Sequence, residues 1–203
     1  MKRNIGMRDV YVAEVTENTV NSYKTGTPVK IARAVSAKIE DKFNSENIYS
    51  DDQLEDTVES YSQTDVELKL NTLSNEEYAK LYTTLSDNGF LVKSAEDLAK
   101  EVALGFRSKR ADGTYDFIWL YCGKFVERPS MEYQTLEDKP SPKEQTLKAI
   151  FSARQKADTI GGKEKHLYQI QVNECELVSD NTEAKTAIGA WFEAVQEYKA
   201  HSI

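Results

Sequence analysis

The sequence predicts a mainly β protein with two flanking helices. Apolar and polar residues alternate from Thr64 to Leu70, the period of a strand that is buried on one face. Residues 102–126 contain two β-prone runs separated by Asp112-Gly113, a pair suited to a hairpin turn. Helical periodicity occurs in two places, after Ser74 and from about Thr182. Together, these observations indicate strands with a helix in the middle and another at the end.

Three strands are predicted before the first helix. Val10, Val12 and Ala13 belong to a β-prone run that ends at the polar turn Glu17-Asn18. The stretch from Val35 to Ile39 alternates with period two. In the third strand, one face carries Val66, Leu68 and Leu70, and the other carries Asp65, Glu67 and Lys69. We expect this strand to lie half-buried on a core.

A short helix is predicted to follow. Ser74 and Glu77 have the spacing of a capping box, which marks a helix start. Asn88-Gly89 is expected to end the helix. We expect it to cover one side or end of the sheet with one apolar face, made of Tyr78, Leu81, Tyr82 and Leu85.

The segment from Val102 to Val126 is the most informative part of the chain. Its first strand alternates through Val102, Leu104 and Phe106, and its second strand is apolar on both faces. One face carries Tyr115, Phe117, Trp119 and Tyr121, and the other carries Ile118, Leu120, Cys122 and Val126. Such a strand cannot have one side in water. Either a sheet and a helix of the same chain cover it, or a neighbouring subunit covers one face.

The rest of the chain supplies two more strands and the second helix. A polar stretch from Arg128 to Glu144, punctuated by prolines, is predicted to be a long loop or edge. Apolar residues then line two strands, Leu147, Ala149 and Phe151 in one and Tyr168, Ile170 and Val172 in the other, with Gly161-Gly162 between them. The final helix, 182–199, should begin at Asp180 or Asn181 and has the stripe Ala184, Ala187, Ile188, Trp191, Val195 and Tyr198.

The segment 45–62 (SENIYSDDQLEDTVESYS) fits poorly into a compact domain. It is polar and acidic, and it lacks the glycine and the final glutamate of a calcium loop. A loop of this length is usually functional or disordered. Two interpretations remain open: a solvated acidic loop, or an arm that reaches a neighbouring subunit.

Several classes of function receive no support from the residues. His166 and His201 do not lie near a nucleophile motif, phosphate-binding loops are absent, and Cys122 and Cys175 lack metal-site spacing. We therefore predict no catalytic residues, no cofactor and no metal. A net charge of −8, from 26 basic and 34 acidic residues, disfavours tight nucleic-acid binding. The chain has neither a secretory signal nor an apolar run long enough to span a membrane, which predicts cytoplasmic synthesis without membrane insertion.

Three motifs resemble the phage major tail (tail-tube) proteins of the phi13 type. Residues 103–125 contain ALGFRSKR, DGTY and IWLYCGKF, which resemble the family's ALGFRSK…WLY.GKF block. The start IGMRDVY at 5–11 resembles the family's opening, and IYSDDQ at 48–53 resembles its LYADD motif. The three occur in the family's order across residues 5–155. The part from Gly161 onward matches no family motif.

The resemblance implies a tail-tube β-sandwich or barrel-like fold, with one or two helices and a long arm loop, over the single domain 1–203. It implies hexameric rings that stack into the tube of a long, non-contractile phage tail in the virion, assembled in the host cytoplasm. Implied partners are other copies of the chain and the tail-tip, tape-measure and tail-terminator proteins. Phage DNA would pass through the lumen without specific binding, which suits an acidic protein.

The resemblance also assigns roles to residues. Contacts between subunits are expected from Ile48, Tyr49, Asp51, Asp52, Glu55 and Asp56. The tube wall or core is expected from Leu104, Phe106, Phe117, Trp119, Tyr121 and Phe125. One alternative is the tube of a contractile phage-tail-like particle or secretion system. Another is a soluble β-rich module that binds a ligand on an aromatic platform, Tyr115, Phe117, Trp119 and Tyr121.

Overall fold

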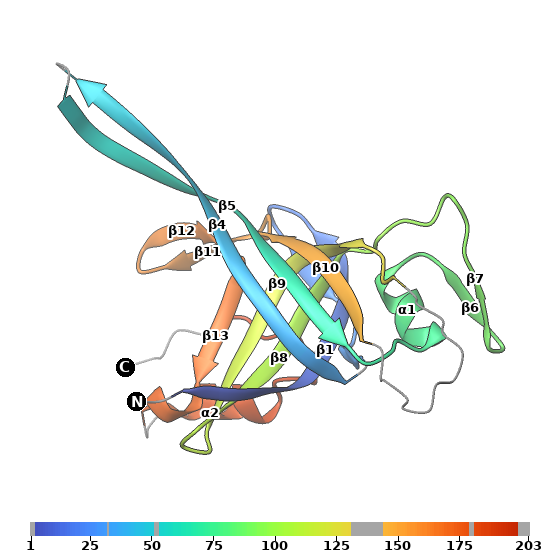
Figure 1. Cartoon of the computed structure of the whole chain (residues 1–203). Helices are drawn as coiled ribbons and strands as arrows, with labels where there is room; N and C mark the ends of the chain where they lie inside the picture. The colour runs from blue at the N-terminus through green and yellow to red at the C-terminus, as the bar shows by residue number, and fades with distance from the viewer. Residues whose placement is uncertain (1–2, 32, 51–52, 131–143, 179–180, 199–203) are drawn as a thin grey trace, which may run out of the picture.

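A computed structural model of the chain describes residues 3–31, 33–50, 53–130, 144–178 and 181–198 (Figure 1). Strands dominate this part of the chain and helices flank them, which confirms the predicted mainly β class. The strands are β1 (Asn4–Asn18), β2 (Tyr23–Thr25), β3 (Val29–Lys30), β4 (Ala34–Ser50), β5 (Gln53–Leu70), β6 (Leu85–Asp87), β7 (Phe90–Val92), β8 (Val102–Arg110), β9 (Tyr115–Glu127), β10 (Gln145–Ser152), β11 (Ala157–Ile160), β12 (Lys163–His166) and β13 (Gln169–Asn173). The helices are α1 (Asn75–Leu81), the 3-10 helix η1 (Glu174–Glu176) and α2 (Thr182–Gly189).

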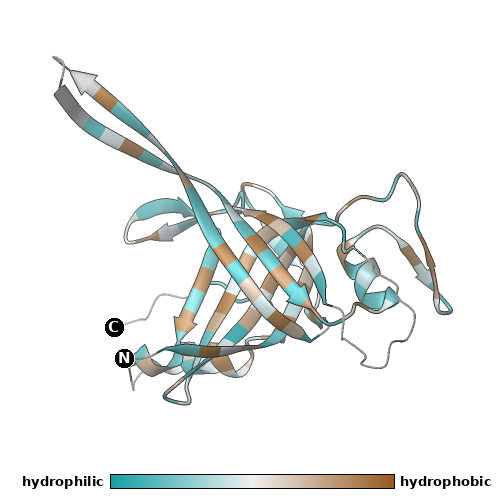
Figure 2. Ribbon diagram, in the orientation of Figure 1, coloured by the Kyte–Doolittle hydropathy of each residue, from teal (hydrophilic) through white to brown (hydrophobic). Residues whose placement is uncertain are grey.

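One antiparallel sheet contains most of the strands. Its order is β2-β1-β8-β9-β10-β5-β4, with β3 also paired to β1 and β13 also paired to β9. The sheet curls until β4 comes back beside β1, and its inner face encloses the main core (Figures 1 and 2). Two small hairpins, β6–β7 and β11–β12, project from this curled sheet.

The alternating strands supply the main core as predicted. Val66, Leu68 and Leu70 of β5 are all buried. On the neighbouring strand β10, Leu147 pairs with Leu68 and Ala149 pairs with Val66. The side chains of directly paired residues lie on the same face of a sheet, so the apolar side chains of both strands point into the core. Burying one such aliphatic side chain stabilises the fold by roughly 1.5–3 kcal/mol relative to leaving it exposed.

Helix α1 closes one end of the curled sheet. The predicted capping box is present: the Ser74 hydroxyl accepts from the Glu77 backbone N–H at 3.2 Å, and Glu77 accepts from the Ser74 N–H at 2.7 Å. The helix ends at Leu81, however, so the prediction that Leu85 shares its apolar face was wrong. Leu85 belongs to β6 and is 60% exposed. Asn88-Gly89 is the turn of the β6–β7 hairpin rather than a helix stop, because both residues have positive φ.

Strands β8 and β9 form the predicted hairpin, with Gly113 at φ +90° in its turn. Val102 pairs with Gly123 and Leu104 with Leu120, so β9 has one extra residue between these pairs. This bulge reverses the faces of the strand beyond it. Val126, which strict alternation would place on the face of Ile118 and Leu120, is therefore 53% exposed, and Phe125 joins that face in the main core, as expected for a wall or core residue.

The outer face of the β8–β9 hairpin is covered by the C-terminal segment. Trp191 packs there with Phe117 and Trp119 in a second buried cluster. Asn181 caps α2 by accepting from the Ala184 N–H at 2.9 Å, which confirms one of the two predicted caps. The predicted helix 182–199 is too long, because α2 ends at Gly189 and a turn brings Trp191 onto the sheet. Both apolar faces of β9 are thus covered by the same chain.

Candidate assembly interface

Strands β4 and β5 form a long hairpin arm. They pair from Ala34 opposite Leu70 to Ser50 opposite Gln53, with three shifts of register along the way. Their near halves belong to the curled sheet, and their far halves project beyond it (Figure 1). Of the two interpretations of segment 45–62, the solvated loop was wrong, because the described residues there belong to a two-stranded ribbon, and the arm that reaches a neighbouring subunit stays a prediction. The local sequence gave no strand signal because neither face of the ribbon packs on a core.

The base of the arm is fixed to the body of the molecule. The Tyr61 ring stacks on Tyr168 with centroids 4.1 Å apart and meets Phe43 edge-on at 5.7 Å. The Tyr61 hydroxyl lies 3.0 Å from Thr64 Oγ1, which donates to Asp41 at 2.5 Å. Tyr168 also donates to Asp41, at 3.3 Å. These contacts set the direction in which the arm projects.

One face of the arm combines apolar and acidic side chains. Glu46 pairs with Val58 and Ile48 pairs with Asp56, so these four side chains share a face. Ile48 is 44% exposed and Val58 is 50% exposed. Segment 45–62 has six acidic and no basic residues. Among the described residues, no ion pair to Glu46, Asp56 or Glu59 is present.

The predicted subunit contacts all belong to this arm. Ile48 and Asp56 lie on its mixed face. The backbones of Tyr49 and Glu55 lie in its two strands, and Asp51 and Asp52 lie outside the described residues. Sequence reasoning assigned the stretch 48–59 to subunit contacts without singling out Val58 and did not include Glu46, because their relation to Ile48 becomes visible only from the pairing register.

The predicted wall or core residues are buried in one chain. Leu104, Phe106 and Phe125 belong to the main core, and Phe117 and Trp119 to the second cluster. Tyr121 is also buried, and its hydroxyl donates to the Gln196 carbonyl at 3.0 Å. The proposed aromatic ligand platform was therefore wrong in this form, since Phe117, Trp119 and Tyr121 offer no exposed ring face.

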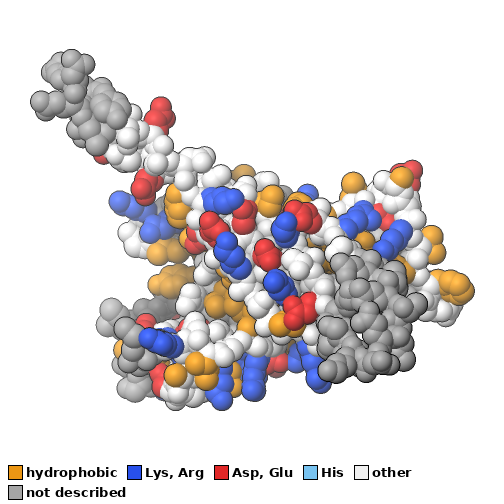
Figure 3. All heavy atoms as spheres, viewed as in Figure 1, with side chains coloured by type: hydrophobic (Ala, Val, Ile, Leu, Met, Phe, Trp, Pro, Cys, Tyr) orange, Lys and Arg blue, Asp and Glu red, His pale blue; other side chains and the backbone are white. Residues whose placement is uncertain are grey.

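The outer face of β4, β5 and β10 is exposed and charged. Figure 3 shows acidic and basic side chains alternating over these strands. Lys38 pairs with Glu40 at 2.9 Å, Lys148 pairs with Glu127 at 2.9 Å, and Lys42 pairs with Asp65. Exposed pairs of this kind contribute only about 0–1 kcal/mol each. Their effect is to leave this face hydrophilic without a continuous stripe of either sign.

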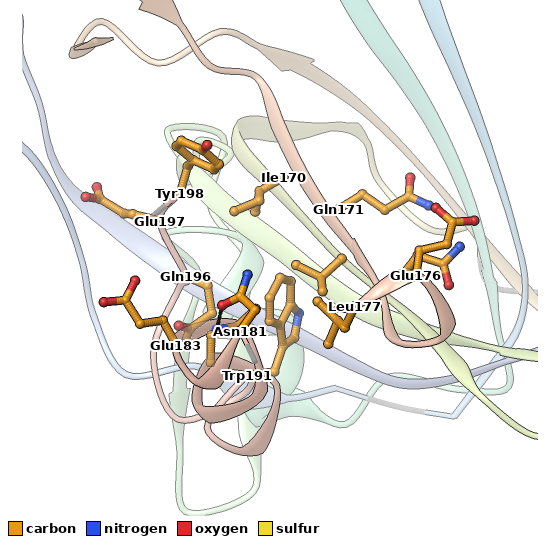
Figure 4. Close-up of a pocket in the computed structure, with 14 residues that line it drawn as sticks. Ile170, Gln171, Glu176, Leu177, Asn181, Glu183, Trp191, Gln196, Glu197 and Tyr198 are labelled. Carbon is orange, nitrogen blue, oxygen red and sulfur yellow. Dashed lines mark hydrogen bonds between the residues drawn. The ribbon is translucent and has the colours of Figure 1, made fainter. Parts of the chain in front are cut away.

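A pocket of about 440 Å³ lies between β13 and the C-terminal segment. Ile170, Val172, Leu177 and Trp191 supply its apolar lining, and Figure 4 shows Asn181, Glu183, Gln196 and Glu197 around them. The Trp191 Nε1–H is buried and has no acceptor among the described residues. The same indole anchors the second cluster, so this residue is required for the fold whether or not the pocket is occupied.

Asp9 is the carboxylate that links β1, β3 and β8. Its backbone lies in a bulge at φ +53°, and it receives Lys30 Nζ at 2.5 Å and Arg107 Nε at 2.7 Å. Burial alone would raise the pKa of Asp9, but the hydrogen bonds and charges of Lys30 and Arg107 hold that pKa below its ordinary value. Asp9 therefore stabilises the fold in its ionised form.

The contacts of Asp9 with Lys30 and Arg107 predict that protonation of Asp9 contributes to acid unfolding. Because the folded pKa is lowered, the stabilisation is present above the unfolded pKa of about 3.9 and is lost as pH falls through the folded pKa. Asp9→Asn tolerates the positive φ and removes the titration. We expect its urea midpoint to fall less than that of the wild type between about pH 6 and about pH 2, the range in which carboxylates titrate. An equal fall of the urea midpoint in the two proteins would contradict this assignment.

No protein-family model matches the chain, and no curated protein matches it as a relative. None of the helices in the described part of the chain has the length and apolar character needed to cross a membrane.

Proposed function

We propose that the chain is the major tail protein of a long, non-contractile-tailed phage and assembles as hexameric rings stacked into a tube. The single observation that carries this proposal is the arm: a hairpin braced at its base that extends beyond its own core. An exposed two-stranded ribbon with apolar side chains is a liability for a monomer. The same features serve a protein whose arm is covered by another copy.

The exposed face of β4, β5 and β10 is the surface we assign to the channel wall. A sheet that lines a DNA conduit must be hydrophilic and must not hold phosphate through a row of unpaired cations. The alternating pairs Lys38–Glu40, Lys42–Asp65 and Lys148–Glu127 meet both requirements. In this arrangement the hairpin 102–126 forms the core behind the wall, and the net charge of −8 discourages DNA from adhering.

The tube of a contractile particle or secretion system remains the alternative within the same architecture. It would use the same arm and wall and would add a sheath around the tube. For a ligand-binding module, the pocket beside Trp191 is the supporting feature. Such a module would give no role to the arm.

The test is assembly with and without the arm. Negative-stain electron microscopy and light scattering of the purified chain over a concentration series should show rings or hollow tubes. Replacing residues 46–58 by Asn-Gly keeps Ser45 opposite Glu59 and supplies a favoured two-residue turn. We expect this variant to remain folded, with a cooperative urea unfolding transition, and to form no tubes.

A matched control removes charge from another exposed hairpin. Glu164→Ala with Lys165→Ala alters β12, which lies outside the arm and the proposed wall. The control should assemble like the wild type. Wild-type protein that stays monomeric at every concentration, or tubes formed without the arm, would contradict the proposal.

A further inference from the structure

A second exposed apolar surface lies on the β6–β7 hairpin. Leu85 pairs with Val92 and Asp87 pairs with Phe90, so all four side chains share one face, with Asp87 at its turn. Leu85, Phe90 and Val92, which we call the β6–β7 face, are 60%, 73% and 54% exposed. Exposed apolar side chains gathered in this way mark interaction sites more often than scattered ones do.

The β6–β7 face is held in place rather than carried on a loose loop. Leu91, on the opposite side of the hairpin, packs against the main core. Asn75 of α1 donates to the Gly89 carbonyl at 2.8 Å, and Thr84 donates to Asp97 at 2.8 Å. The surface therefore exists before any partner arrives, which lowers the entropic cost of binding.

The arm has the complementary character. Its mixed face presents Ile48 and Val58 between acidic side chains. Around α1 and the β6–β7 hairpin, Lys80, Lys93 and Arg128 are exposed together with Glu76, Asp87 and Glu96, and no ion pair in the described part of the chain joins any of the three cations to a carboxylate. Apolar groups can therefore meet at the centre while opposite charges meet at the rim, as in specific interfaces.

We propose that the β6–β7 face of one copy receives the Ile48–Val58 face of the arm of another copy. The inference rests on the proposed function and names the surface that the arm contacts. The arm and the β6–β7 hairpin project from opposite ends of the molecule (Figure 1), so an arm cannot cover its own β6–β7 face. Each docked pair leaves one free arm and one free face, which is the head-to-tail contact that propagates a filament.

The first test alters the receiving surface. Phe90→Ser with Val92→Ser removes two of its three apolar side chains, and both positions are exposed, so the fold should be retained. We expect the protein concentration needed for tubes to rise on the order of tenfold to a hundredfold, as for loss of central interface residues. Val20→Ser with Val178→Ser removes equally exposed side chains elsewhere and should leave assembly unchanged.

The second test traps the contact between two different copies. In a Cys175→Ser background, Val58→Cys protein is mixed with Val92→Cys protein under mild oxidation. We expect a disulfide-linked dimer from this mixture and none when Val20→Cys replaces Val92→Cys.

The outcomes separate the inference from the proposed function. Normal tubes from the Phe90→Ser/Val92→Ser variant, or no selective cross-link, would overturn the inference and leave the tail-tube proposal standing. A wild-type chain that remains monomeric, together with no cross-link between the Val58→Cys and Val92→Cys proteins, would overturn both. Weakened tubes together with the selective cross-link support both.

Discussion

Trp119→Ala should unfold at a much lower urea concentration than the wild type. Trp119 is fully buried, and its Nε1–H donates to the Trp191 carbonyl at 3.0 Å. Its ring fills the space above Gly105, where even an added Cβ would lie 2.6 Å from the ring atoms. Removing the side chain leaves a large cavity, and we expect a loss of about 3–5 kcal/mol in the free energy of unfolding.

The matched control for this prediction is Phe90→Ala, another aromatic truncation at a position that is 73% exposed. It should change the free energy of unfolding by no more than about 0.5 kcal/mol. A cost below about 1 kcal/mol for Trp119→Ala would show that the C-terminal segment collapses onto the vacated site. Such a result would show that the second cluster repacks easily around the lost indole.

Arg154→Met should be the most damaging change outside the two apolar clusters. The guanidinium is fully buried between Tyr121 and Tyr23, whose ring centroids lie 4.5 and 5.2 Å away. It pairs with Asp158 and with Glu197 at 2.6 Å, and so ties the turn after β10 to the C-terminal segment. Removing one partner of a buried pair typically costs 3–5 kcal/mol. We expect a loss of about 3 kcal/mol, since both carboxylates can regain water.

Lys156→Met provides the comparison, because Lys156 pairs with the same Glu197 at 3.0 Å from a more exposed position. Its loss should cost no more than about 1 kcal/mol. Urea unfolding of Arg154→Met, of Glu197→Gln and of the double variant Arg154→Met/Glu197→Gln measures the coupling between residues 154 and 197. If Arg154→Met and Lys156→Met cost the same, the buried position of Arg154 has no special energetic weight.

The sequence identified the elements whose signals are local. The Ser74–Glu77 capping box, the turn at Asp112-Gly113, the Asn181 cap and the inward face of β5 follow from chemistry within a few residues. Each depends on hydrogen bonds or alternation that a short window of sequence contains. The mainly β class followed from the same signals.

Tertiary structure decided the features that depend on distant partners. The bulge between Leu120 and Gly123 buries Phe125 in place of Val126, and only the pairing with β8 reveals it. The C-terminal helix stops at Gly189 because Trp191 docks on β9, which lies far away in the sequence. The β6–β7 hairpin replaced the end of a predicted helix because Thr83 and Thr84 bond to Leu98 and Asp97.

The candidate interface shows the same division. The sequence alone marked residues 45–62 as acidic and unsuited to a core. Their arrangement as a ribbon, and the sharing of one face by Ile48 and Val58, came from the register of β4 against β5. A strand without a core has no apolar alternation, because its stability comes from backbone hydrogen bonds to its neighbour. The composition of the arm was therefore determined by sequence, and its shape by pairing.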